Sequence, residues 1–226
     1  MKGAEMKRIL FCMLAMLVVF ALVTPAHAFL INRGMDTLGN RLIYDNDLDI
    51  TWYDFSNTIN TWDNQVAWAL DLSVTFGSTT YDDWRLPSTV DGPFVFGWDG
   101  TITAGYNITN SEMGHLFYTE LGNLGLYAID GTGPQPGWGL TNTGDFQNLS
   151  ASWYWSGTEY ATNTDNAWVF GFIQGIQGEG NKGSGLYALA VRSGDVAAVP
   201  EPATVALLGI GLAGMAAYGA KRRQRR

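Results

Sequence analysis

The residues that could act as acids, bases or metal ligands are few. His115 is the single histidine between Phe29 and Val199, so a site built from several histidines is excluded. A serine–histidine–aspartate triad would need the same residue, which lies in a predicted helix without a nucleophile-elbow motif nearby. We therefore expect His115 on a helix surface and predict no catalytic residue. Carboxylate pairs for glycoside hydrolysis stay open, but no pattern singles two of them out.

Three aspartates alternate in the segment DNDLD, at Asp45, Asp47 and Asp49. Clustered carboxylates are typical of sites for hard cations such as calcium. An EF-hand-like loop starting at Asp45 would need glycine at its sixth and glutamate at its twelfth position, where this sequence has Ile50 and Ser56. We interpret the segment as a hairpin turn and predict no metal site and no cofactor, although so acidic a surface leaves weak calcium binding open.

Nine tryptophans make stacking on sugar rings a possible chemistry. Trp98 in FGWDG and Trp138 in QPGWGL lie in glycine-rich loops, and together with Asp99, Tyr106 and Asn107 they are the predicted ligand contacts. The alternative, in which the loops fold back and bury both rings, stays open. The other seven lie in predicted strands, helices or recurrent motifs and are assigned to the core: Trp52, Trp62, Trp68, Trp84, Trp153, Trp155 and Trp168.

Cations are scarce in this part of the chain. Five basic side chains stand against nineteen acidic ones between Phe29 and Val199, which gives a net charge of about −14. This balance argues against nucleic acid and other polyanions as partners, and permits neutral sugars, cations or basic proteins. We expect Arg85 and Arg192 to form ion pairs with Asp82, Asp83 or Glu159 rather than to clamp a substrate.

Hydrophobic periodicity predicts the elements that position these residues. Strands are expected at 42–44 and 48–53 around a turn at 45–47, with Leu48, Ile50 and Trp52 on one face. One helix is expected from an N-cap at Asn60 or Thr61 to an exit at Gly77. A second helix follows a capping box at 109–112 and carries apolar residues at 113, 116, 117, 121 and 124. Residues 81–107 and 130–144 are predicted loops.

The last predicted strands cover 152–160, 167–175 and 187–194. The final two are expected to pair as an antiparallel hairpin across the glycine-rich segment 176–185.

Both ends of the chain read as export signals. Residues 1–28 have a basic region, an apolar stretch and a small-x-small site, which predicts cleavage by signal peptidase after Ala28, with Met1 or Met6 as the start. The only cysteine, Cys12, lies in this segment, so disulfides and thiolate chemistry are excluded from the mature protein.

Near the other end, the triplet Pro200, Glu201 and Pro202 precedes an apolar span at 203–220 and a basic tail at 221–226. Eighteen helical residues reach roughly 27 Å, enough to cross a bilayer core.

Several strings occur in the order typical of one family: YDNDLDITW, TWDNQVAWA, DDWRLPS, YWSGTEY, AWVFGF and LAVRSGD. In these strings the segment 41–195, after a lead at 29–40, resembles the Lcl C-terminal domain family. The resemblance implies an α+β fold of the C-type-lectin-like kind, with two helices packed on a small, mostly antiparallel sheet whose terminal strands pair, and with long loops. It also implies glycan binding. The Glu-Pro-Asn and Gln-Pro-Asp triplets of calcium-dependent sugar sites are absent, as are the cysteines of the formylglycine-generating relatives.

Residues 196–226 resemble the PEP-CTERM sorting signal of Gram-negative bacteria that make exopolysaccharide. That resemblance implies transient anchoring in the inner membrane, cutting near Pro-Glu-Pro by an exosortase, and release to the cell surface or extracellular matrix. The alternative is a permanent anchor that dimerises through Gly209, Ala213 and Ala217.

We therefore predict an exported, non-enzymatic surface or biofilm-matrix protein that binds a ligand, with exopolysaccharide or another matrix component as the expected partner. The relatives' sulfated ligands should be repelled by a charge near −14, which favours a neutral or cationic glycan, or a protein. A matrix glycosidase and a purely structural matrix protein are the alternatives.

Overall fold

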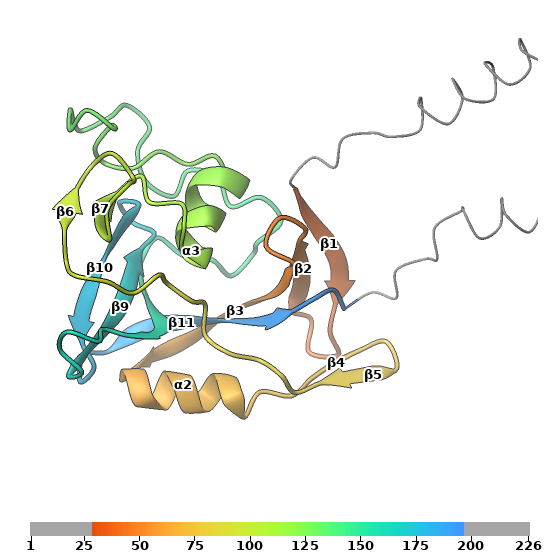
Figure 1. Ribbon diagram of the computed structural model, residues 1–226. Helices are drawn as coiled ribbons and strands as arrows, with labels where there is room; N and C mark the ends of the chain where they lie inside the picture. The colour runs from red at the N-terminus through yellow and green to blue at the C-terminus, as the bar shows by residue number, and fades with distance from the viewer. Residues whose placement is uncertain (1–28, 197–226) are drawn as a thin grey trace, which may run out of the picture.

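The computed structural model describes residues 29–196, which form a nine-stranded mixed sheet in the order β1-β2-β3-β11-β8-β9-β10-β7-β6 and a separate β4–β5 pair (Figure 1). All neighbours in the large sheet are antiparallel except β11–β8 and β6–β7, which are parallel. The predicted α+β class is confirmed, but the sheet is larger than expected. The strands are β1 (Leu30–Met35), β2 (Arg41–Asp45), β3 (Ile50–Asn60), β4 (Val74–Phe76), β5 (Thr79–Tyr81), β6 (Phe96–Gly97), β7 (Ala104–Tyr106), β8 (Trp153–Glu159), β9 (Asn166–Gly171), β10 (Ile176–Asn181) and β11 (Leu186–Ser193).

The first predicted hairpin is confirmed, because β2 and β3 pair antiparallel and Ile50 and Trp52 enter one core with Leu48 against it. Its turn lies at 46–49, so it starts one residue later and ends two residues later than predicted, because Asp45 still belongs to β2 and β3 begins only at Ile50. The Oδ1 atom of Asp45 accepts hydrogen bonds from the backbone N–H groups of Asp47 and Leu48, both at 3.1 Å. Within the predicted lead 29–40, β1 extends the sheet by pairing with β2.

The predicted hairpin between the last two strands is wrong. The glycine-rich segment is itself a strand, β10, and it forms the hairpin with β9. The final strand β11 instead pairs antiparallel with β3 and meets β8 in parallel. Packing disfavours a side chain at Gly180 of β10, since a Cβ there would lie 3.3 Å from Val169 and 3.4 Å from Trp155. A strand that leaves room for a neighbouring indole therefore lacks the side-chain alternation by which strands are recognised.

The first predicted helix is shorter than expected. Helix α2 spans Trp62–Leu70, with Thr61 as N-cap in extended conformation but without a side-chain cap bond. The following residues form the β4–β5 hairpin, and Gly77 lies in its turn with φ of 60° instead of ending the helix. The pairing of β4 with β5 therefore prevails over the helical pattern of the sequence after Leu70. Leu70 itself is exposed at the end of α2.

The second helix begins and ends differently from the prediction. Ser111, not Thr109, is the N-cap, and its hydroxyl accepts a hydrogen bond from the N–H of Gly114. Helix α3 (Glu112–His115) passes directly into one turn of π-helix, η1 (Leu116–Glu120), closed by the bond from the N–H of Leu121 to the carbonyl of Leu116 at 2.9 Å. Leu124 lies outside the helix and is exposed.

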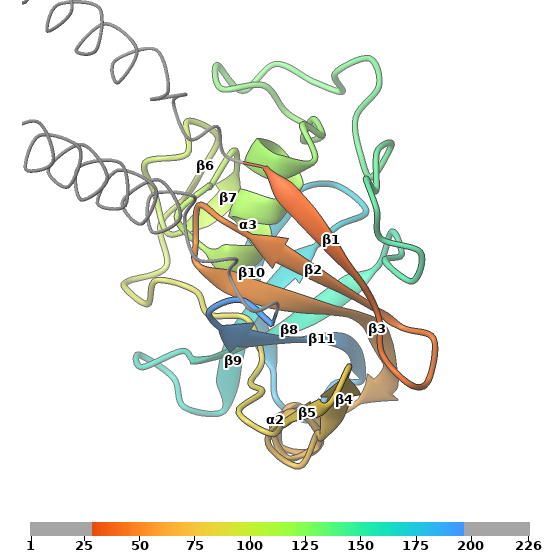
Figure 2. The ribbon, with the colours of Figure 1, turned by 90° about the vertical axis from the view of Figure 1, so that its right-hand side faces the viewer.

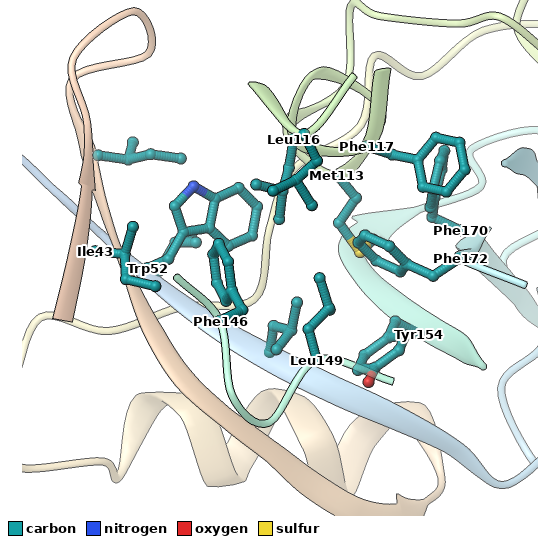
Figure 3. Packing of buried hydrophobic residues seen from close by; sticks show 14 residues of the cluster. Ile43, Trp52, Met113, Leu116, Phe117, Phe146, Leu149, Tyr154, Phe170 and Phe172 are labelled. Carbon is teal, nitrogen blue, oxygen red and sulfur yellow. The ribbon is translucent and has the colours of Figure 1, made fainter. Parts of the chain in front are cut away.

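The two helical segments lie on opposite sides of the central strands β3 and β11 (Figures 1 and 2). The larger core lies beneath α3 and η1, where Met113, Leu116 and Phe117 pack on residues of β3, β8, β9 and β11 (Figure 3). On the other side, Ala69 of α2 packs in a second core that includes Trp155. The central strands are thus covered on both faces by apolar cores, one under α3 and η1 and one under α2.

Within residues 29–196, no helix is long and apolar enough to cross a membrane. The predicted signal peptide 1–28, the sorting triplet 200–202, the span 203–220 and the basic tail 221–226 lie outside the described residues.

Candidate functional site

Four aromatic rings gather where the segment 94–107 meets the segment 121–139. We call the group Phe96, Trp98, Tyr106 and Tyr127 the Trp98 face. Ring centroids are separated by 6.0 Å for Phe96–Trp98, 6.5 Å for Trp98–Tyr127 and 5.1 Å for Tyr106–Tyr127. Phe96 and Trp98 are 49% and 42% exposed, whereas Tyr106 is 4% exposed and lies beneath them. The group offers two exposed aromatic rings on a buried aromatic base.

Asn107 fixes the backbone of this face. Its φ of 60° is in the left-handed region, which asparagine tolerates better than most residues. Its Nδ2 group donates to the carbonyl of Trp98 at 2.7 Å and to the carbonyl of Tyr127 at 3.1 Å. Its own backbone N–H donates to the hydroxyl of Tyr118 at 2.9 Å, and that hydroxyl donates to the carbonyl of Gly175. Burial raises the pKa of Tyr118, which keeps its hydroxyl a neutral donor.

Two exposed carboxylates border the Trp98 face. Asp99 follows Trp98 and accepts hydrogen bonds from the backbone N–H and the hydroxyl of Thr101, at 3.0 and 2.9 Å. Asp130 has the same arrangement with Thr132, and the next residue, Gly131, lies against the Trp98 ring. These hydrogen bonds lower the pKa of Asp99 and the pKa of Asp130, so both stay ionised.

The structure thus brings together four of the five predicted ligand contacts: Trp98, Asp99, Tyr106 and Asn107. The fifth, Trp138, is 38% exposed and lies in the neighbouring segment 135–139, where its backbone pairs with Leu124. Among residues 29–196, no aromatic ring contact joins Trp138 to the Trp98 face. Of the seven tryptophans assigned to the core, four are buried and Trp62, Trp68 and Trp153 are half-buried.

The two singled-out arginines form ion pairs, one of them with a predicted partner. Arg192 binds Asp83 through Nε and Nη2 at 2.8 and 3.0 Å, as expected. Arg85 binds Glu112 through two hydrogen bonds of 2.7 Å, so the predicted partners for Arg85 are wrong. A capping box would have used the carboxylate of Glu112 to accept a hydrogen bond from the N-cap of its own helix. In the structure this carboxylate instead accepts hydrogen bonds from Arg85 and from the backbone N–H of Ser88.

The prediction of His115 on a helix surface is also wrong. Its side chain is 14% exposed and points to Glu120, with 3.2 Å between Nε2 and Oε1, and to Asp47, with 3.7 Å between Nε2 and Oδ2. Asp45 completes the group, and the ligand atoms of Asp45, His115 and Glu120 all lie within 4.8 Å of one another. Burial raises the pKa of Asp45, and burial together with the charge of Asp45 raises the pKa of Glu120. We call Asp45, His115 and Glu120 the His115 cluster.

Comparison with known families assigns one segment of the chain. Residues 198–223 match the PEP-CTERM protein-sorting motif. The motif indicates an exported protein that is processed by an exosortase and reaches the cell surface or the extracellular space. The comparisons with curated proteins and with solved structures gave no match. The PEP-CTERM motif therefore supports the predicted destination, while the activity of the folded part must be argued from its own residues.

Proposed function

We propose that this protein is a non-enzymatic surface or matrix protein whose folded part binds a neutral glycan on the Trp98 face. The observation that carries the proposal is the pair of exposed rings, Phe96 and Trp98, on a buried aromatic base. The apolar face of a pyranose can stack on such rings, and rings held in place lose little entropy on binding. The PEP-CTERM motif indicates export to the cell surface or the extracellular space, which is where the proposal places the glycan ligand.

Polar groups for orienting a sugar lie beside the rings. The carboxylates of Asp99 and Asp130 are exposed and ionised, and they suit the hydroxyl groups of a neutral sugar as hydrogen-bond acceptors. They would repel a sulfated or carboxylated chain, as would the net charge of about −14. Trp138 belongs to the proposal as a second contact along an extended chain.

Binding is favoured over hydrolysis by the same two carboxylates. A glycosidase needs a carboxylic acid whose pKa is raised, so that it can protonate the leaving oxygen. The hydrogen bonds from Thr101 and Thr132 instead lower the pKa of Asp99 and the pKa of Asp130. The proposal therefore gives these groups a role in recognition.

An array of neutral, cationic and sulfated glycans tests the proposal directly. We expect binding to neutral glycans, and a loss of affinity of at least about fivefold, or about 1 kcal/mol, for Trp98→Ala and for Phe96→Ala. Leu70→Ala is the matched control, because Leu70 is exposed on α2, away from the Trp98 face. No binding by the wild-type protein, or equal binding by Trp98→Ala, would favour the structural alternative. Turnover of a bound glycan would favour the glycosidase.

We further propose that the segment 41–195 is an Lcl C-terminal-type domain with a C-type-lectin-like fold, and that a span at 203–220 anchors the chain until the exosortase cuts near Pro-Glu-Pro. The mixed sheet, the two helices and the long loops support the first point. The intact mass of the protein recovered from the medium tests the second. A mass that still includes Arg226 would contradict the cut.

A further inference from the structure

The His115 cluster joins two segments that are far apart in the chain, β2 and the continuous helical segment formed by α3 and η1. Asp45 ends β2, His115 ends α3 and Glu120 ends η1. The π-helical turn is what brings the last two together. In an α-helix, residues five apart point about 140° away from each other, whereas a π-turn aligns them. Here the His115 Nε2 and Glu120 Oε1 atoms are 3.2 Å apart. A π-turn is rare and is frequently found at functional sites.

When both carboxylates of this cluster are ionised, they carry more negative charge than one imidazolium can balance. Asp45 is fully buried, and the side chain of Glu120 is 2% exposed. Asp45 uses Oδ1 for two backbone N–H groups, while Oδ2 has only the indole N–H of Trp52 at 3.5 Å. Among residues 29–196, the carboxylate of Glu120 has one hydrogen-bonding partner, His115, through Oε1. Two buried carboxylates that share one imidazole are costly unless one of them is protonated or a cation lies between them.

The ligand set identifies the class of cation. One imidazole nitrogen with two carboxylates suits a divalent first-row transition metal such as zinc, whereas calcium takes oxygen ligands alone. Asp47, whose Oδ2 lies 3.7 Å from Nε2 of His115, stands beside the cluster as a fourth donor. A cleft of about 300 Å³, lined by Thr119, Glu120, Asn142 and Asp145 among others, lies beside the cluster on the side of Glu120.

We propose that Asp45, His115 and Glu120 bind a divalent transition-metal ion, with Asp47 or water completing its coordination. The ion would tie the β2–β3 turn to η1. The same π-turn carries Tyr118, whose hydroxyl accepts a hydrogen bond from the backbone N–H of Asn107. The metal would therefore brace the helical segment that supports the Trp98 face, although the proposal does not depend on glycan binding.

The test uses the purified protein, treated with chelator, and zinc chloride as the probe. Calorimetry should give one zinc ion per chain and a rise in melting temperature, and cobalt(II) should give a visible absorption spectrum typical of nitrogen and oxygen ligands. His115→Gln and Glu120→Gln should each weaken zinc binding at least tenfold. Asp145→Asn is the matched control, since Asp145 lines the same cleft without belonging to the cluster, and it should bind zinc like the wild type.

Two kinds of result would overturn the proposal, one from the wild-type protein and one from a variant. A wild-type protein that binds neither zinc nor cobalt(II), or that binds calcium alone, overturns the proposal. Zinc binding that persists unchanged in folded His115→Gln, as judged by circular dichroism, overturns it as well.

Discussion

Asn107 holds the Trp98 face in two ways, through the hydrogen bonds of its side-chain amide and through its left-handed backbone, and two substitutions distinguish them. Asn107→Gly removes the hydrogen bonds from Nδ2 to the carbonyls of Trp98 and Tyr127 but accepts the φ of 60° without strain. Asn107→Ala removes the same bonds and adds a Cβ in the left-handed region. Both variants keep the backbone N–H that reaches Tyr118. The difference between them therefore reports the strain that alanine adds, less the flexibility that glycine adds to the unfolded chain, and their shared loss measures the amide.

Each of the two hydrogen bonds contributes about 0.5–1.5 kcal/mol, so Asn107→Gly should lower the free energy of unfolding by about 1–3 kcal/mol. The left-handed conformation costs alanine about 1–2 kcal/mol, offset in part by the flexibility that glycine adds to the unfolded chain, about 0.5–1 kcal/mol. Asn107→Ala should therefore lose roughly 1 kcal/mol more than Asn107→Gly.

Urea denaturation measures the free energy of unfolding of both variants. Amide hydrogen exchange across residues 94–107 measures any local opening that leaves the rest of the fold intact. Asn64→Ala is the control, because the side chain of Asn64 is exposed and bonds only to that of Asn60 on the same helix terminus. If both Asn107 variants match the wild type within about 0.5 kcal/mol and exchange at the same rate, Asn107 does not hold the face, and the reasoning is refuted.

Three further predictions concern single residues of the fold. Glu112→Gln should lower the free energy of unfolding by about 1–3 kcal/mol in urea, because it breaks a half-buried pair with Arg85. Gly105→Ala should cost about 2 kcal/mol or more and loosen β6 in hydrogen exchange, since its Cβ would lie 2.0 Å from the carbonyl oxygen of Gly97 at a φ of +113°. Burial raises the pKa of Asp54 in the folded state, so its contribution to stability is full at acid pH and is lost as the pH rises through that pKa. Urea denaturation from acid to neutral pH should therefore show the wild type losing stability relative to Asp54→Asn as the pH rises.

Local patterns predicted the parts of the fold that depend on local pairing. Alternation at Leu48, Ile50 and Trp52 predicted the β2–β3 hairpin, and the split between core and loop tryptophans agrees with their burial. The β9–β10 hairpin was missed because β10 carries Gly178 and Gly180 where a strand usually shows side chains. Pairing of β11 with β3 joins segments more than 120 residues apart, and no local signal sets such a register.

The Trp98 face could be predicted in part, because aromatic residues in glycine-rich loops are visible in the sequence. Its second half could not, since Tyr127 enters from another loop and gave no signal of its own. The His115 cluster was hidden for a different reason. Under α-helical geometry, His115 and Glu120 point in different directions, and only the π-turn brings them together.

The π-turn η1 therefore links the two candidate sites through opposite sides of one short element. Glu120 faces the buried Asp45, while the hydroxyl of Tyr118 contacts the backbone of both Asn107 and Gly175. Because both contacts come from one five-residue segment, we expect a shift at one of them to move the other. Metal occupancy should consequently slow amide exchange in residues 94–107 as well as at the cluster itself. Zinc that protects residues 41–50 and 112–121 but leaves 94–107 unchanged would show that the two sites are independent.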